Sequence, residues 1–141
     1  MKPEILECAI SLPLCGGGIP AGFPSPAADY ALEDIDLAKY LCPKPGATYI
    51  VRVSGDSMND AFIPENALLV VDRSIVPQNK MIVVAVLNNE FTVKRFISNS
   101  SGIRLMPESR NNKWKPIPIT EGMDFKVWGV VTKIIVDALK V

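Results

Sequence analysis

Histidine is missing from this sequence, and its absence excludes the commonest nucleophilic chemistry. Ser-His-Asp and Cys-His catalysis both need an imidazole base, so the chain cannot build either from its own residues. Zinc sites that use histidine are excluded for the same reason. The 3 cysteines, Cys8, Cys15 and Cys42, form no CxxC pair, which argues against a metal cluster. We therefore expect neither a metal nor another cofactor, and any nucleophile here needs a different base.

Long apolar runs and an excess of one charge are also missing. No stretch approaches the roughly 18 apolar residues of a membrane helix, and residues 1–10 hold two glutamates and a lysine, unlike a signal peptide. Few cysteines, odd in number, suit a reducing compartment. The 15 basic and 15 acidic residues cancel, so no strong direct nucleic-acid binding is expected. We expect a cytoplasmic protein that binds no membrane.

Residues 1–29 contain few periodic signals and many residues that interrupt regular structure. Glycines at positions 16–18 are followed by prolines at 20, 24 and 26. Glycine is costly to order, and proline biases the residue before it to extended backbone. We predict a flexible or extended arm outside the core, although the composition alone also fits a disordered tail.

The rest of this chain of 141 residues, 48% of them hydrophobic, is long enough for one domain with a core. A short helix is expected at 36–41, because Asp36 can cap it and Pro43 follows its end. Asn88-Asn89 favours a hairpin, since asparagine tolerates left-handed backbone. Runs of valine, isoleucine and phenylalanine predict strands at 48–53, 67–71, 81–87, 90–96, 103–106 and 125–136. The predicted fold class is mainly β.

Lysine is the base that remains, provided that its pKa falls from about 10.4 toward neutrality. Burial lowers the pKa of an amine, so this lysine should lie inside a core element. Lys94 fits best, because it lies within the expected strand 90–96, with Thr92 and Phe96 on the same face. Arg95 cannot serve, since guanidinium does not deprotonate in proteins. The plain alternative is a strand lysine that extends its amine to water.

Ser57 is the candidate nucleophile. It lies in Ser54-Gly55-Asp56-Ser57-Met58, directly after the expected strand 48–53. A serine in a turn opened by glycine can expose its hydroxyl, and neighbouring backbone N–H groups can then point at a developing oxyanion. The plain alternative is an ordinary turn in which serine and aspartate side chains bind the local backbone.

Four segments together resemble the LexA/UmuD family of self-cleaving serine–lysine proteins. Their order and spacing agree with that family from about residue 21 onward, with 35 positions between Gly22 and Ser57 and 37 between Ser57 and Lys94. The segments are the nucleophile turn 53–58 with the acidic-ended run 68–72, the lysine strand 91–95, the last strand 125–131, and GFPSPAADY at 22–30, which resembles the sequence after the cleaved bond.

The resemblance implies a signal-peptidase-like, β-strand-rich protease domain at 22–141 after a cleavable arm at 1–21. Ser57 would be the nucleophile and Lys94 its general base, with backbone N–H groups of Asp56 and Ser57 as the oxyanion hole. The cleaved bond would be Ala21-Gly22, because the matching segment follows Gly22. Cys15-Gly16 stays an alternative, since family members also use Cys-Gly and a small residue before glycine suits either bond.

Only 21 residues precede Gly22, too few for a helix-turn-helix DNA reader, so we expect the UmuD branch of the family. That branch implies a homodimer in the SOS response to DNA damage, cut with stimulation by a RecA–single-stranded-DNA filament. The trimmed protein would join a UmuC-like Y-family polymerase in error-prone translesion synthesis. The alternatives are a LexA-like or phage repressor core that only dimerises, a signal peptidase, and an interaction module without cleavage.

Overall fold

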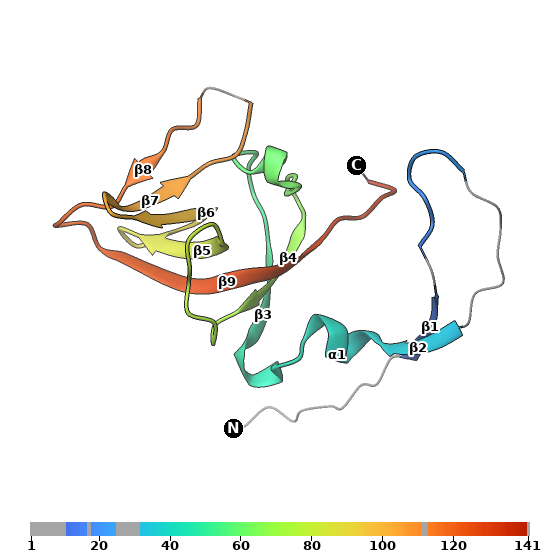
Figure 1. The fold of residues 1–141 in the computed structure, drawn as a ribbon. Coiled ribbons are helices and arrows are strands. Elements are labelled where there is room, and N and C mark those ends of the chain that lie inside the picture. Colours follow the sequence, from blue (N-terminus) through green and yellow to red (C-terminus); the bar gives the residue numbers. More distant parts are fainter. Residues whose placement is uncertain (1–10, 17, 25–31, 111–112, 141) are drawn as a thin grey trace. The chain divides into compact units, whose positions relative to one another are not determined.

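The computed structural model describes residues 11–16, 18–24, 32–110 and 113–140 (Figure 1). The chain divides into two compact units, Met1–Pro43 and Lys44–Val141. The predicted boundary after residue 21 is of another kind, because it marks a bond to be cut, and it stays a prediction.

The N-terminal unit contains a small antiparallel sheet and one short helix. Strand β1 (Ser11–Cys15) pairs with β2 (Leu32–Asp36), so that Ser11 lies opposite Asp36 and Cys15 opposite Leu32. Neither strand was predicted, because the partners are distant in the sequence and Pro13 interrupts the strand pattern. The helix α1 (Leu37–Leu41) confirms the prediction, and Asp36 caps it by accepting a hydrogen bond from the Lys39 N–H at 3.2 Å.

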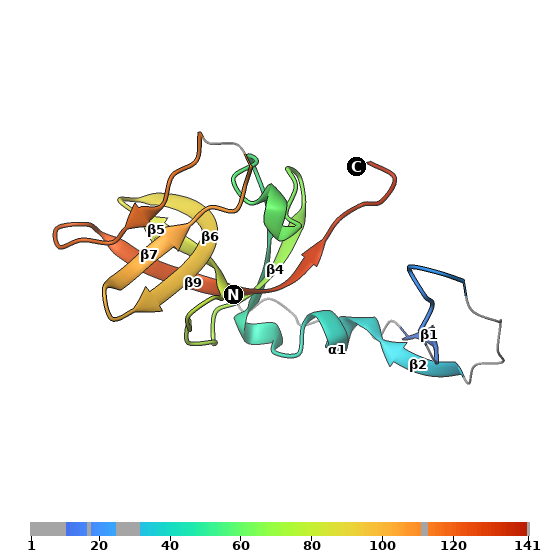
Figure 2. The ribbon, with the colours of Figure 1, turned by 45° about the horizontal axis from the view of Figure 1, so that its top comes forward.

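The C-terminal unit is built on one antiparallel sheet of seven strands in the order β3-β4-β9-β5-β6-β7-β8. Strands β5, β6 and β7 lie side by side in both ribbon views, and β9 crosses the middle of the sheet (Figure 2). The elements are η1 (Pro45–Ala47), β3 (Thr48–Arg52), η2 (Asn59–Ala61), β4 (Leu68–Asp72), β5 (Ile82–Leu87), β6 (Glu90–Asn99), β7 (Gly102–Met106), β8 (Ile117–Pro118) and β9 (Phe125–Ile135).

The predicted strands are confirmed to within a few residues, as is the mainly β class. The hairpin between β5 and β6 is also confirmed: Asn88 and Asn89 have φ of 48° and 67°, the left-handed backbone that a two-residue turn needs. Strand β8 was missed, because two residues that include a proline carry no periodic signal.

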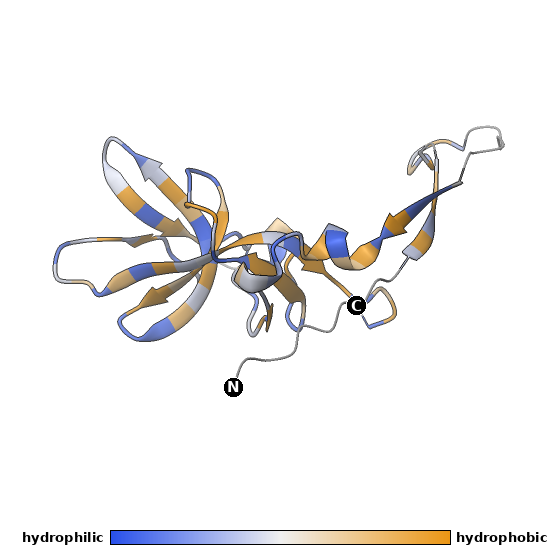
Figure 3. Ribbon diagram, turned by 90° about the horizontal axis from the view of Figure 1, so that it is seen from below, coloured by the Kyte–Doolittle hydropathy of each residue, from blue (hydrophilic) through white to orange (hydrophobic). Residues whose placement is uncertain are grey.

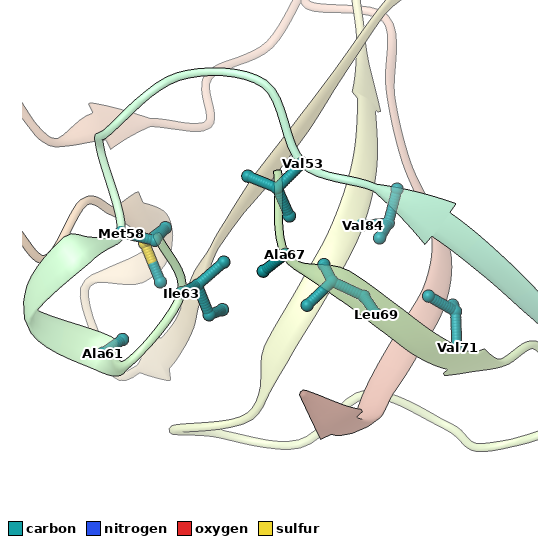
Figure 4. Packing of buried hydrophobic residues seen from close by; sticks show 8 residues of the cluster. All are labelled: Val53, Met58, Ala61, Ile63, Ala67, Leu69, Val71 and Val84. Carbon is teal, nitrogen blue, oxygen red and sulfur yellow. The ribbon is translucent and has the colours of Figure 1, made fainter. Parts of the chain in front are cut away.

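Two buried clusters pack in this unit, and neighbouring residues of β5 belong to different ones. Val84 belongs to the first cluster, and Val83 and Ala85 to the second. This follows from the alternation of side chains along a strand. Apolar and polar residues are both present along the strands of the sheet (Figure 3). The first cluster joins β3 and β4 to the turn after Ser57 (Figure 4), through Val53, Met58, Ala61, Ile63, Ala67, Leu69, Val71 and Val84.

Strand β9 is irregular beside Trp128. Its pairing with β5 shifts register there, since Val84 lies opposite Gly129 and Ala85 opposite Val127. Such a bulge bends a strand and increases its twist. A Cβ atom added at Gly129 would lie 2.5 Å from Cγ1 of Val71, a fully buried side chain. Glycine is therefore required here by close packing between β9 and β4.

We expect Gly129→Ala to lower the free energy of unfolding by about 1–3 kcal/mol, because the new methyl group overpacks a rigid β-branched neighbour. Urea denaturation of wild type and variant measures the difference. Gly46→Ala is the matched control, since an added Cβ there meets no atom within 4 Å, and its effect should stay below about 0.5 kcal/mol. Equal unfolding midpoints for the two variants would contradict the packing argument.

Candidate active site

Ser57 lies in a turn between β3 and η2 that is anchored on both sides. Before it, Gly55 has φ of +95°, a conformation that other residues adopt only with strain. After it, Met58 is buried in the first cluster, with 2% of its surface exposed. Met58 cannot move without disturbing the core, so the position of the preceding Ser57 is fixed by the packing of its neighbour.

Lys94 lies in the middle of β6, opposite Val83 of β5. Only 7% of the residue is exposed, and it is one of two buried charged residues found in the described part of the chain. Its Nζ lies 3.0 Å from Ser57 Oγ, 2.7 Å from Thr92 Oγ1 and 3.1 Å from the Val93 carbonyl oxygen. The structure therefore brings together the two side chains that the sequence singled out.

These three contacts suit a neutral amine. An uncharged lysine has two N–H donors and one lone pair. Thr92 Oγ1 and the Val93 carbonyl can accept the two hydrogens, which leaves the lone pair for the hydroxyl proton of Ser57. Thr92 shares the lysine's face of the strand, as the alternation predicts, and its Oγ1 is a partner of the amine, a role that the sequence did not indicate.

Burial lowers the pKa of the Lys94 amine, because a charged ammonium loses hydration there. Among the described residues no carboxylate forms an ion pair with it that would restore the charged form. The Trp114 ring centroid is 6.0 Å from Nζ, at the limit of a cation–π contact. Desolvation without an anionic partner is the change that a lysine base needs.

The predicted oxyanion hole consists of the backbone N–H groups of Asp56 and Ser57. Within the described ranges, neither group donates a backbone hydrogen bond, whereas both carbonyls accept one, from Asn59 and Glu108 respectively. Among the described residues, these two N–H groups therefore have no backbone acceptor and are available to a ligand. Their role stays a prediction, since it depends on where a substrate carbonyl binds.

A cleft of about 410 Å³ opens beside the two side chains. Apolar residues from β3, β5, β6 and β9 form most of its wall, and the polar Ser57–Lys94 pair lies within it. Apolar walls around a few polar groups are typical of binding sites. The lining residues are Val51, Arg52, Val53, Ser54, Gly55, Ser57, Met58, Val84, Phe91, Thr92, Val93, Lys94 and Trp128.

The two candidate cleavage bonds lie in the N-terminal unit and differ in their local structure. Cys15 is the last residue of β1 and pairs with Leu32 of β2. Ala21 and Gly22 form an exposed bend beyond β1, and no hydrogen bond between described residues involves them.

The described residues contain neither a group of three or more potential metal ligands nor a helix long and apolar enough to cross a membrane.

Comparison with known proteins identifies the family of the chain. Residues 13–132 match the family model described as "Peptidase S24-like". The chain is 42% identical to protein MucA of Salmonella typhimurium over 146 aligned positions, which cover 97% of this chain and 96% of MucA.

Two further relatives show how broad this similarity is. Protein ImpA of Escherichia coli is 39% identical over 87% of this chain and 82% of its own. The LexA repressor of Caldicellulosiruptor saccharolyticus is 40% identical over 89% of this chain, which spans 59% of that repressor. The chain therefore belongs to the Peptidase S24-like family and is a UmuD-like member of the LexA/UmuD group that its motifs indicated.

Proposed function

We propose that this protein is a serine endopeptidase that cleaves its own Ala21-Gly22 bond, with Ser57 as nucleophile and Lys94 as general base. The observation that carries the proposal is the 3.0 Å contact between Lys94 Nζ and Ser57 Oγ at a buried lysine. A buried amine that has no anionic partner among the described residues is unfavourable for stability alone, since burial penalises its charge. The arrangement has a clear use in catalysis.

Each step follows from these groups. Neutral Lys94 takes the hydroxyl proton of Ser57 as Oγ attacks the Ala21 carbonyl, and the N–H groups of Asp56 and Ser57 hold the oxyanion. The Lys94 ammonium then protonates the Gly22 nitrogen as the peptide bond breaks, which leaves Ala21 as an ester on Ser57. Water, deprotonated by Lys94, hydrolyses the ester and frees a carboxylate at Ala21.

The local structure of the arm supports Ala21-Gly22 over Cys15-Gly16. Cutting after Cys15 would require residues of β1 to leave their pairing with β2. The exposed bend at Ala21 and Gly22 breaks no pairing on entering a cleft. Cleavage would be slow if the bend rarely occupied the cleft, since an observed rate scales with the competent fraction.

For the biological role, we propose the UmuD-like function. The protein would act as a cytoplasmic homodimer in the SOS response, with a RecA–single-stranded-DNA filament raising the competent fraction. The domain 22–141 would then serve as the trimmed subunit of an error-prone translesion polymerase with a UmuC-like Y-family partner. Similarity to MucA over 96% of its length supports this choice. The LexA similarity favours the second candidate, a repressor-like core that only dimerises.

Incubation with RecA, ATP and single-stranded DNA should convert the intact chain to residues 22–141, because the nucleophile and its base are already in contact. Intact-mass measurement and N-terminal sequencing identify the bond. A product that begins at Gly16 would move the cut to Cys15-Gly16. An unchanged mass would favour an interaction module without cleavage.

Ser57→Ala and Lys94→Ala should each lower the cleavage rate by at least about a hundredfold, because one removes the nucleophile and the other its base. Matched controls are Ser98→Ala and Lys126→Ala, which alter exposed residues of β6 and β9. Cleavage is followed by gel densitometry, and folding by circular dichroism. Full activity in either site variant would refute the mechanism.

Spontaneous cleavage should accelerate as pH rises from about 7 to about 10, because only deprotonated Lys94 accepts the serine proton. Its lowered pKa places the rise below that of an ordinary lysine. Single-turnover rates of the purified protein across this range give the profile. A flat rate would contradict a lysine base.

A further inference from the structure

The turn that carries Ser57 is held by a loop that the sequence did not point to, the segment after β7. Glu108 makes two backbone hydrogen bonds to the turn. Its N–H donates to the Ser57 carbonyl oxygen at 2.8 Å, and its own carbonyl accepts from the Asp60 N–H at 2.8 Å. The backbone of Glu108 is therefore hydrogen-bonded both to Ser57 and to Asp60 in η2.

The side chain of Glu108 is held in turn by Arg95. The guanidinium binds the carboxylate through two nitrogens, with Nε to Oε1 at 2.5 Å and an Nη to Oε2 at 3.1 Å. The side chains are 27% and 32% exposed, so the pair is partly desolvated. The Arg95 hydrogen bonds hold the pKa of Glu108 below its usual value. A bidentate contact defines both the distance and the relative orientation of the guanidinium and the carboxylate, whereas a single hydrogen bond defines the distance alone.

Arg95 directly follows Lys94 in β6, and successive strand residues point to opposite faces. One stretch of backbone therefore carries the base on one side and the anchor of the Glu108 loop on the other. The contacts close a ring from Lys94 to Arg95, to Glu108, to the Ser57 backbone, and through Ser57 Oγ to Lys94 Nζ. A shift of Glu108 would change the distance between hydroxyl and amine.

We propose that Arg95 and Glu108 are positioning residues that keep Ser57 Oγ in register with Lys94 Nζ, an inference that rests on the proposed function. Neither side chain touches the reacting atoms. They act through the hydrogen bond between the Glu108 N–H and the Ser57 carbonyl. The other reading is an ion pair that contributes to stability only, as most partly exposed pairs do.

Glu108→Gln separates the two readings, because it removes the charge while leaving the backbone N–H in place. The assay is covalent labelling of Ser57 by a small fluorophosphonate, in which the Oγ–P bond forms and fluoride leaves. This probe reports on Ser57 and Lys94 without requiring the arm to enter the cleft. We expect the maximal labelling rate to fall about tenfold, with the half-saturating probe concentration and the pH midpoint unchanged.

Arg95→Gln is measured as well, because Arg95 also donates to the Lys80 carbonyl oxygen at 2.9 Å. The losses of Arg95→Gln and Glu108→Gln should not add in the double variant, since both changes break the contact between the guanidinium and the carboxylate. The matched control is Asp137→Asn, which removes the carboxylate of an exposed pair with Lys140 and should leave labelling unchanged. Circular dichroism melts confirm that every variant is folded at the assay temperature.

The outcomes distinguish this inference from the proposed function. Equal maximal labelling rates for wild type and Glu108→Gln would refute the positioning role and leave the cleavage mechanism standing. Additive losses in the double variant would also refute it. A wild-type protein that neither cuts itself nor labels at Ser57 would refute the proposed function, and this inference with it.

Discussion

The burial of the Lys94 amine is the constraint on which the rest of the site depends. A charged ammonium is stable in water and unfavourable in a strand between packed neighbours, so burial lowers its pKa. The cost is reduced because Thr92 Oγ1 and the Val93 carbonyl accept its hydrogens. The same arrangement leaves the third direction for Ser57 Oγ, at 3.0 Å. The contacts that satisfy the buried amine are therefore the same contacts that would prepare it for the proposed role as a base.

The sheet supplies the rigidity that this contact requires. Lys94 lies in β6, which is hydrogen-bonded to β5 and β7 on its two sides. Ser57 precedes Met58, which is buried in the first cluster. Each partner is thus attached to packed elements by its own backbone, and the Glu108 loop links the two. A hydrogen bond between mobile side chains would exchange with water, whereas one between anchored elements keeps the geometry that proton transfer needs.

The N-terminal unit accounts for the choice of bond in the proposed self-cleavage. Antiparallel pairing of β1 with β2 ends at Cys15, so that bond belongs to a paired strand. The Ala21-Gly22 bend is exposed and keeps its backbone groups outside the hydrogen bonds of the described residues. A protease cleft binds an unpaired backbone, which makes the bend the less costly substrate. The sequence likeness of the segment after Gly22 and the local structure of the arm thus favour the same bond by independent arguments.

The sequence by itself determined the chemistry that was possible, whereas the tertiary structure decided the geometry. Missing histidine left lysine as the candidate base, strand patterning placed Lys94 inside a core element, and Asn88-Asn89 predicted the hairpin before it. These signals are local, because periodicity and turn preferences act over a few residues. The 3.0 Å contact across 37 positions, the Glu108 partner and the β1–β2 pairing had no such local signal. They arise where distant segments meet, and only the packing of the sheet decides which segments do.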